Sequence, residues 1–230
     1  MRGTFRPTFI ELTSLDRVRL RRVAMRYAGH GWDVTPGACL ARHRFVCGRP
    51  GCPTTGCHPA LTDWERSATA DPARIAAWWR SRPHGVLLAT GRAFDAIEVP
   101  AHLGQRVVDV TRWATALVGP GGCPGRGPVA VTPTGRWIFL VRPGDPLRPE
   151  LDRCLFIVRH GLGSWIPAPP TRLPEGPVRW ATAPEETRWR LPDPYAVQEL
   201  LVDALHATNP AVPVPVGPAA GHLPAPRTGD

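Results

Sequence analysis

The highest density of side chains that can bind a metal ion occurs in a loop rich in Cys, Gly and Pro, which spans residues 37–59. Its densest group is a series of evenly spaced thiols followed by an imidazole: Cys47, Cys52, Cys57 and His58. Three thiolates and one imidazole complete a tetrahedral zinc site, and four residues between successive thiols suit a loop that wraps one ion. We therefore expect these side chains to bind a structural zinc ion.

The same loop offers other ligands and another interpretation. Cys39 and His43, just upstream, are alternative ligands for the same ion. Metal binding would stabilise a loop that has too little apolar content to fold by packing; the alternative is a flexible loop of unligated thiols. Cys123 and Cys154 are interpreted as a loop thiol and a small buried side chain. A nucleophilic Cys is disfavoured, because no His and acid stand beside one in the sequence.

Length and charge restrict the function less sharply. The chain has 230 residues, enough to bury a core without disulfides, and a formal net charge of +9. A basic surface attracts polyanions, because neutralising phosphates releases condensed counterions. Lys is absent, however, and a chain that uses Arg alone is also typical of a GC-rich genome. The charge by itself therefore does not establish a nucleic-acid partner.

The apolar runs of the sequence are short. The N-terminal residues 1–22 are basic but contain no run long enough for a signal peptide, and no later stretch approaches a membrane span. We therefore expect a cytoplasmic protein with no membrane contact. Thiols stay reduced in that compartment, so the six Cys are expected to be free or bound to metal.

The periodicity of apolar residues predicts helices and strands without strict alternation. Helices are expected at residues 14–28, 71–79, 101–117 and 195–207. Strands are expected at residues 32–35, 85–90, 94–99, 155–159, 164–168 and 178–181, and a hairpin at 128–132 and 136–142. This mixture predicts a single α+β domain over residues 1–208. The Pro-, Ala- and Gly-rich tail 209–230 is expected to be disordered, because it cannot bury enough apolar surface.

Several short segments follow one another in a characteristic order between about Ser14 and Ala181. They are Tyr27-Ala-Gly-His-Gly-Trp-Asp-Val, Gly56-Cys57-His58-Pro59, Ala68-Thr-Ala-Asp-Pro, Trp78-Trp79, Gly85-Val-Leu-Leu-Ala-Thr-Gly91, Val131-Thr-Pro-Thr-Gly-Arg and Val158-Arg-His-Gly-Leu-Gly-Ser-Trp-Ile-Pro-Ala-Pro-Pro-Thr171. Each segment alone is not specific for any family. Together, their order and spacing resemble the N-terminal domain of bifunctional DNA primase-polymerases (prim-pol), in the archaeo-eukaryotic primase superfamily.

The resemblance implies both a fold and an activity. The fold is α+β, with an RRM-like mixed sheet flanked by helices, into which the Cys-rich loop is inserted. Active members synthesise a primer or a DNA strand on a template, with carboxylates that hold two Mg²⁺ or Mn²⁺ ions and a His that helps to bind the nucleotide phosphates. Two carboxylates one residue apart on a strand project from the same face and can share these ions.

The acidic strand implied by the resemblance falls on Phe94-Asp-Ala-Ile-Glu-Val-Pro100. Glu98 fits the first carboxylate position, whereas Pro100 occupies the second and cannot bind a metal. Asp95 is nearby, but its offset of three residues from Glu98 places it on the other face of a regular strand. Asp95 and Glu98 are therefore a degenerate catalytic pair.

The positions implied for the nucleotide-binding His and for the third carboxylate also carry other side chains. The His should follow Thr134-Gly135, where the chain has Arg136 and then Trp137. The third carboxylate should directly precede Val158, where the chain has Ile157. The remaining acidic charge is too small to hold paired divalent ions, so we expect polymerase activity to be absent or vestigial.

Three functions fit this pattern. The first is an impaired prim-pol domain that still binds nucleotides or nucleic acid, with Arg92, Arg136 and Arg159 at phosphates and Trp137 or Trp165 on a base. Trp on a sheet also commonly fills a core. DNA and a helicase or another replication protein are the partners that this function implies.

The second function is an active primase-polymerase that uses Asp95 and Glu98 with a loop carboxylate such as Asp145 or Asp152. The third is a zinc-stabilised module for protein interaction or regulation, with no role in nucleic-acid binding. Primer synthesis that depends on Glu98 would favour the second function. Failure to bind DNA at low ionic strength would favour the third, because an electrostatic binder tightens there.

Overall fold

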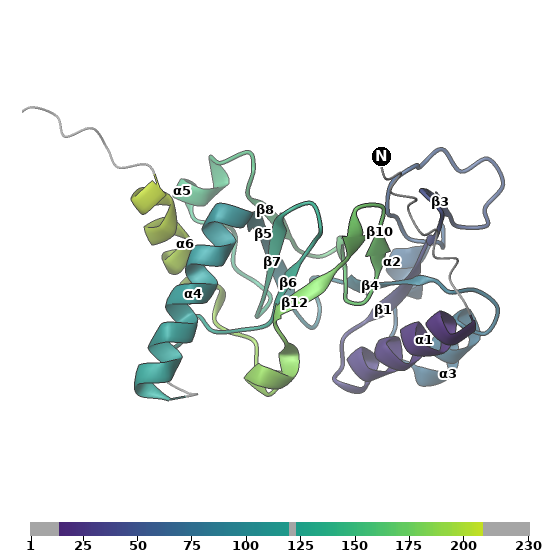
Figure 1. Cartoon of the computed structure of the whole chain (residues 1–230), viewed down its shortest axis with the longest axis horizontal. Helices are drawn as coiled ribbons and strands as arrows, with labels where there is room; N and C mark the ends of the chain where they lie inside the picture. Colours follow the sequence, from purple (N-terminus) through teal and green to yellow (C-terminus); the bar gives the residue numbers. More distant parts are fainter. Residues whose placement is uncertain (1–13, 120–122, 209–230) are drawn as a thin grey trace, which may run out of the picture.

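The computed structural model describes residues 14–119 and 123–208 of the chain (Figure 1). The elements run in the order α1 (Ser14–Gly29), β1 (Val34–Gly37), β2 (Cys39–Ala41), β3 (Arg44–Val46), α2 (Trp64–Ser67), α3 (Pro72–Trp78), β4 (Gly85–Ala89), β5 (Asp95–Pro100), α4 (Ala101–Val118), β6 (Val129–Val131), β7 (Arg136–Val141), α5 (Pro149–Asp152), β8 (Val158–His160), β9 (Trp165–Pro167), β10 (Arg172–Leu173), β11 (Gly176–Pro177), β12 (Arg179–Thr182), a 3-10 turn η1 (Pro184–Thr187) and α6 (Pro194–Thr208). The α+β class is therefore confirmed.

The largest sheet contains five strands in the order β12-β6-β7-β5-β8. Four of its strands, β5 to β8, with α4 and α5 as crossovers, form the β-α-β-β-α-β arrangement of an RRM-like fold, and β12 adds a fifth strand at the edge next to β6. Each crossover skips one strand position in the sheet. Strand β7 therefore lies between β5 and β6, and β5 lies between β7 and β8. Every strand pair among the described residues is consequently antiparallel, and the expectation of a mixed sheet was wrong in this detail.

The N-terminal half builds a second, three-stranded sheet in the order β1-β4-β9. Helices α1 and α3 lie together beside this sheet, at the opposite end of the molecule from α4 and α6 (Figure 1). The short pair β10–β11 lies between the two sheets, next to β12, which is the edge strand of the five-stranded sheet. Strand β9 comes from late in the chain, directly after β8, so the three-stranded sheet joins residues that are far apart in the sequence.

Two hydrophobic cores result from this arrangement. The first joins the two sheets, with Trp32 and Val86 from the N-terminal half packed in one cluster with Ala96 and Ile138 of the five-stranded sheet. The second lies on the other face of the five-stranded sheet, under α4 and α6. Successive residues of β5 therefore enter different cores, because side chains alternate along a strand. This alternation decides where each acidic residue of β5 can act.

The four predicted helices agree closely with the structure, whereas the short helices α2 and α5 were not predicted. Helices α1, α4 and α6 end within a residue or two of their predicted bounds. In α3, Pro72 stands in the first turn and Asp71 caps the helix, because its Oδ1 accepts a hydrogen bond from the Ala73 amide at 2.9 Å. The predicted tail, residues 209–230, lies outside the described residues.

The strands show more differences. The hairpin of β6 and β7 is confirmed, whereas β8 begins at Val158, later than predicted. The pair β2–β3 inside the Cys-rich loop was not predicted. Its turn contains Arg42 at a φ of 58°, a conformation that Gly or Asn usually signals in a sequence, so the usual turn signal was missing.

Gly104 of α4 provides a direct test of how the second core is packed. A Cβ at Gly104 would lie 2.4 Å from the Trp137 side chain on β7. Gly to Ala usually stabilises a helix interior by up to about 1 kcal/mol, but overpacking costs roughly 1–3 kcal/mol. We expect Gly104→Ala to lower the free energy of unfolding, measured by urea denaturation. In a Trp137→Leu background the same substitution should instead stabilise the chain; stabilisation in the natural background would contradict this packing.

Candidate functional site

Glu98 is the centre of a small polar cluster on β5. Its carboxylate is held from both sides: Arg136 Nε donates to Oε1 at 2.6 Å, and His160 Nε2 lies 3.0 Å from Oε2. The other ring nitrogen of His160, Nδ1, lies 2.9 Å from Ser164 Oγ. We call these four residues the Glu98 cluster: Glu98, Arg136, His160 and Ser164.

Strand pairing explains how distant residues meet at Glu98. Strand β5 pairs with β7 so that Pro100 lies opposite Arg136, and with β8 so that Ala96 lies opposite His160. Pro100 and Ala96 are each two residues from Glu98, so all of these side chains share one face of the sheet. No role for His160 was predicted, because its contact with Glu98 depends on the register in which β8 pairs with β5.

The charge balance of the cluster follows from these contacts. Burial alone would raise the pKa of Glu98, but hydrogen bonds from His160 and Arg136 outweigh burial and lower it. Glu98 is therefore ionised at neutral pH, and its charge is already compensated by Arg136. Arg136 Nη2 also donates to the Phe156 carbonyl at 2.7 Å, which fixes the guanidinium in place. This cluster is built to hold one carboxylate, and it has no excess negative charge for a divalent cation.

Asp95 belongs to a different environment. Its side chain is only 3% exposed, and Oδ2 accepts hydrogen bonds from Arg159 Nη2 at 2.6 Å and from the Gly144 amide at 3.1 Å. The alternation of β5 places Asp95 on the opposite face from Glu98, as its offset of three residues predicted. The structure therefore does not bring the two predicted catalytic carboxylates together.

The residues that lie across from Glu98 are apolar. Ile138 is its partner on β7, and Val158 is its partner on β8. Ile157, the position expected to correspond to the third carboxylate, is buried in the second core instead. Val158, and not Ile157, therefore lies beside Glu98, and neither side chain can bind a metal.

Trp137 and Trp165 lie apart from the Glu98 cluster. Trp137 packs on the second core against Gly104, on the helix-covered face of the sheet, and Trp165 lies on β9 opposite Ala89. Trp137 therefore does not face Glu98, because adjacent residues of β7 point to opposite faces and Arg136 takes the side toward Glu98.

A cavity of about 420 Å³ adjoins the Ser164 end of the cluster. Its lining includes the charged side chains of Asp33, Glu65, Arg66 and Arg92. Arg92 is 61% exposed and forms an ion pair with Asp33 at 3.4 Å. The cavity wall depends on Gly91, whose φ is 93° and where a Cβ would lie 2.2 Å from Leu162 Cα. Arg92 is therefore near the cluster but does not contact Glu98.

The Cys-rich loop brings together a possible metal centre. Atoms of Cys47, Cys52 and His58 that can bind a metal all lie within 4.8 Å of one another. Cys52 Sγ is 3.6 Å from His58 Nε2, and His58 Nδ1 is 2.7 Å from the Gly56 carbonyl. Because a carbonyl oxygen only accepts, Nδ1 carries a proton, and Nε2 is the ring nitrogen that faces the thiols. These three residues, which we call the Cys–His group, can hold a metal ion.

The other predicted ligands are not part of this group. Cys57 directly precedes His58 but is not a member of the group within 4.8 Å, and burial raises its pKa to about 12. Cys39 lies 3.6 Å from His84 Nδ1, and burial raises its pKa to about 11. His43 lies in the turn between β2 and β3, outside the group.

Arg49 stabilises the thiolate form of the group. Its Nε donates to Cys47 Sγ and its Nη2 to Cys52 Sγ, both at 3.4 Å. Burial opposes ionisation of Cys47, but hydrogen bonds from His58 and Arg49 prevail and lower its pKa to about 6. A thiolate is the form that binds metal, so the loop is prepared for a cation.

The comparisons with known proteins give one match. The sequence model of the family described as bifunctional DNA primase/polymerase, N-terminal, matches residues 24–195, a range that includes both the Glu98 cluster and the Cys–His group. No curated protein and no solved structure matches the chain. Across residues 14–119 and 123–208, no helix combines the length and apolar character that crossing a bilayer requires.

Proposed function

Because the chain belongs to the bifunctional DNA primase/polymerase N-terminal family, we propose that it is a member that binds nucleic acid without catalysing nucleotidyl transfer. DNA is the expected ligand, and a helicase or another replication protein is the expected partner. The Glu98 cluster takes the place of the two-metal site of active members.

The surroundings of Glu98 carry this proposal. Two-metal catalysis needs several carboxylates around the ions, which activate the attacking hydroxyl and neutralise the leaving pyrophosphate. On the Glu98 face of β5, β7 and β8, the other described positions are apolar or basic, and Glu98 itself is neutralised by Arg136. Asp95 is buried on the other face and paired with Arg159. Two adjacent divalent ions would therefore be opposed by a guanidinium where they need carboxylates.

Basic side chains on the surface support binding in the absence of catalysis. Arg136 and Arg92 keep 26% and 61% of their side chains exposed, close to the face on which active relatives bind nucleotides. Arg159 is 30% exposed and forms an ion pair with the buried Asp95, so it contacts a phosphate only through the donors that Asp95 does not use. Guanidinium groups donate several hydrogen bonds to a phosphate at once, and the net charge of +9 adds a long-range attraction.

The second part of the proposal is that the Cys–His group holds zinc. Thiolate and imidazole ligands favour zinc among the common divalent ions, and Cys47, Cys52 and His58 would be its protein ligands. The ion would hold together a loop that has only a small apolar cluster of its own. Its role is then structural, since the Glu98 cluster lies in another part of the molecule.

A primer-synthesis assay tests the loss of catalysis. With Mg²⁺ or Mn²⁺, a DNA template and nucleotides, we expect no extension or dinucleotide product above background, against an active family member as positive control. Glu98→Ala should leave this background unchanged, because the carboxylate is not holding catalytic ions. Product formed by the natural chain and abolished by Glu98→Ala would show an active enzyme and contradict the proposal.

DNA binding is tested separately by a gel-shift or anisotropy titration over a range of salt concentrations. We expect binding that weakens steeply as salt rises. Arg136→Gln should weaken it, whereas Arg106→Gln, an exposed arginine on α4, should have little effect. Failure to bind DNA even at low ionic strength would favour a module for protein interaction.

A further inference from the structure

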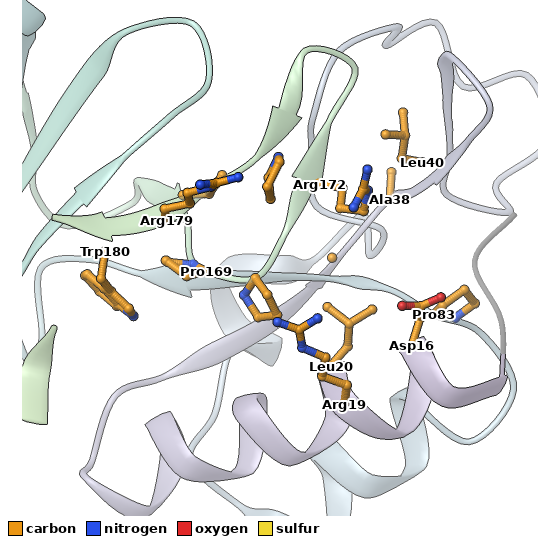
Figure 2. A pocket seen from close by; sticks show the side chains of 14 residues that line it. Asp16, Arg19, Leu20, Ala38, Leu40, Pro83, Pro169, Arg172, Arg179 and Trp180 are labelled. Atoms are coloured by element: carbon orange, nitrogen blue, oxygen red, sulfur yellow. The ribbon is translucent and has the colours of Figure 1, made fainter. Parts of the chain in front are cut away.

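A second cavity, of about 440 Å³, lies between helix α1 and the segment that runs from Pro169 to Trp180 (Figure 2). It is separate from the Glu98 cluster, none of whose residues line it. Its volume falls within the range typical of small-molecule sites, about 300–1,000 Å³. The lining combines basic side chains with an apolar wall, and each part indicates a property of the ligand.

The basic part consists of three arginines from separate elements. Arg19 comes from α1, Arg172 from β10 and Arg179 from β12. Figure 2 shows Arg19 on one side of the cavity and Arg172 and Arg179 on the other. None of the three guanidinium groups forms a hydrogen bond or ion pair with another residue that the structure describes. With Asp16 as the acidic side chain of the lining, the cavity carries a net positive charge.

These arginines differ from those of the Glu98 cluster and of β8. Arg136 and Arg159 compensate the half-buried or buried carboxylates of Glu98 and Asp95. Arg19, Arg172 and Arg179 form no such ion pair with a described residue, and all three are exposed where they line the cavity. Guanidinium groups that converge on a concave site from three elements match an anion with several oxygen atoms, such as a polyphosphate.

The apolar part of the lining is held firmly in place. Leu20 and Val178 are buried at 6% and 1% exposure, and Pro169 and Trp180 complete this wall. Tyr27 fixes two of its members, because its hydroxyl donates to the Pro169 carbonyl at 2.7 Å and accepts from Trp180 Nε1 at 3.2 Å. A rigid apolar wall beside basic groups matches a ligand with a flat apolar body and an anionic end.

We propose that this cavity binds a nucleoside polyphosphate, with the phosphates held by Arg19, Arg172 and Arg179 and the base against the wall that includes Trp180. The site is additional to the function proposed for the Glu98 cluster and does not depend on it. A nucleic-acid strand fits less well, because the apolar and basic groups surround one nucleotide-sized cavity instead of following an extended track.

The test is a calorimetric titration of the full chain with ATP at low ionic strength. We expect one saturable site that Arg172→Gln with Arg179→Gln weakens by about tenfold for each arginine removed. The matched control is Arg106→Gln with Arg153→Gln, which removes the same charge from exposed positions outside the cavity and should leave ATP binding unchanged. Circular dichroism of the variants confirms that these surface substitutions leave the chain folded.

Further ligands and variants separate the alternatives. Arg136→Gln, which alters the Glu98 cluster, should not change ATP binding, so this site and the proposed DNA-binding function can fail independently. The proposal is overturned if ATP does not bind, or if Arg172→Gln with Arg179→Gln has no more effect than the control pair. It is equally overturned if inorganic triphosphate binds as tightly as ATP, or if single-stranded DNA binds at these arginines in preference to ATP.

Discussion

Arg159→Met is expected to lower the free energy of unfolding by about 3 kcal/mol, because it leaves the buried Asp95 carboxylate without its counter-charge. Asp95 is 3% exposed on its side chain, and its Oδ1 is buried without a hydrogen-bond partner among the described residues. The remaining hydrogen bond from the Gly144 amide cannot compensate a full negative charge in that position. Urea denaturation followed by circular dichroism measures the change.

An exposed ion pair provides the matched control for this result. Arg142 pairs with Asp193, with 60% and 43% of the two side chains exposed, so Arg142→Met should cost less than about 1 kcal/mol. Adding Asp95→Asn to Arg159→Met should recover much of the loss, since a neutral amide needs no counter-charge. Equal effects of Arg159→Met and Arg142→Met would show that Asp95 is not the buried, charged anchor described above.

Cys52→Ser is expected to remove bound zinc from the purified full-length chain and to lower its melting temperature by roughly 5 °C or more. The sulfur of Cys52 lies 3.6 Å from His58 Nε2 within the Cys–His group, and a hydroxyl is a much poorer zinc ligand than a thiolate. Metal content is measured by mass spectrometry of the purified protein, and stability by thermal denaturation with and without a chelator.

Cys123→Ser is the control, because Cys123 lies outside the group and should change neither zinc content nor melting temperature. Cys57→Ser should retain zinc, since the structure places Cys57 outside the three-residue group. Zinc retained by both Cys47→Ser and Cys52→Ser, or a natural chain that contains no zinc and is unaffected by a chelator, would contradict the proposed metal centre.

The two results address different parts of the same conclusion. If Asp95 is a structural anchor paired with Arg159, it is not available as a catalytic carboxylate, and Glu98 is the one carboxylate on its face of the sheet among the described residues. If zinc stabilises the Cys-rich loop, the metal that the chain binds is structural and lies outside the Glu98 cluster. Both outcomes agree with a family member that has kept its scaffold and lost its catalytic metals.

Local patterns in the sequence were sufficient for much of the fold. Apolar periodicity located α1, α4 and α6, and Pro72 after Asp71 marked the start of α3. The alternation of side chains along a strand also predicted that Asp95 and Glu98 point to opposite faces. These features depend on residues within one element, so they do not require knowledge of what the element contacts.

The partners of each functional residue depended on the tertiary structure. Glu98 and His160 are 62 residues apart, and their contact exists only because β8 pairs with β5 in one register. A shift of one residue turns every side chain of a strand to the other face, which is why Val158 and not Ile157 lies opposite Glu98. The same dependence on distant contacts brought Arg19 to the cavity of Arg172 and Arg179. The sequence by itself therefore determined the main helices and the side chains without carboxylates at Pro100, Trp137 and Ile157, whereas long-range pairing decided which charges meet, because side-chain contacts follow register and packing that no local pattern contains.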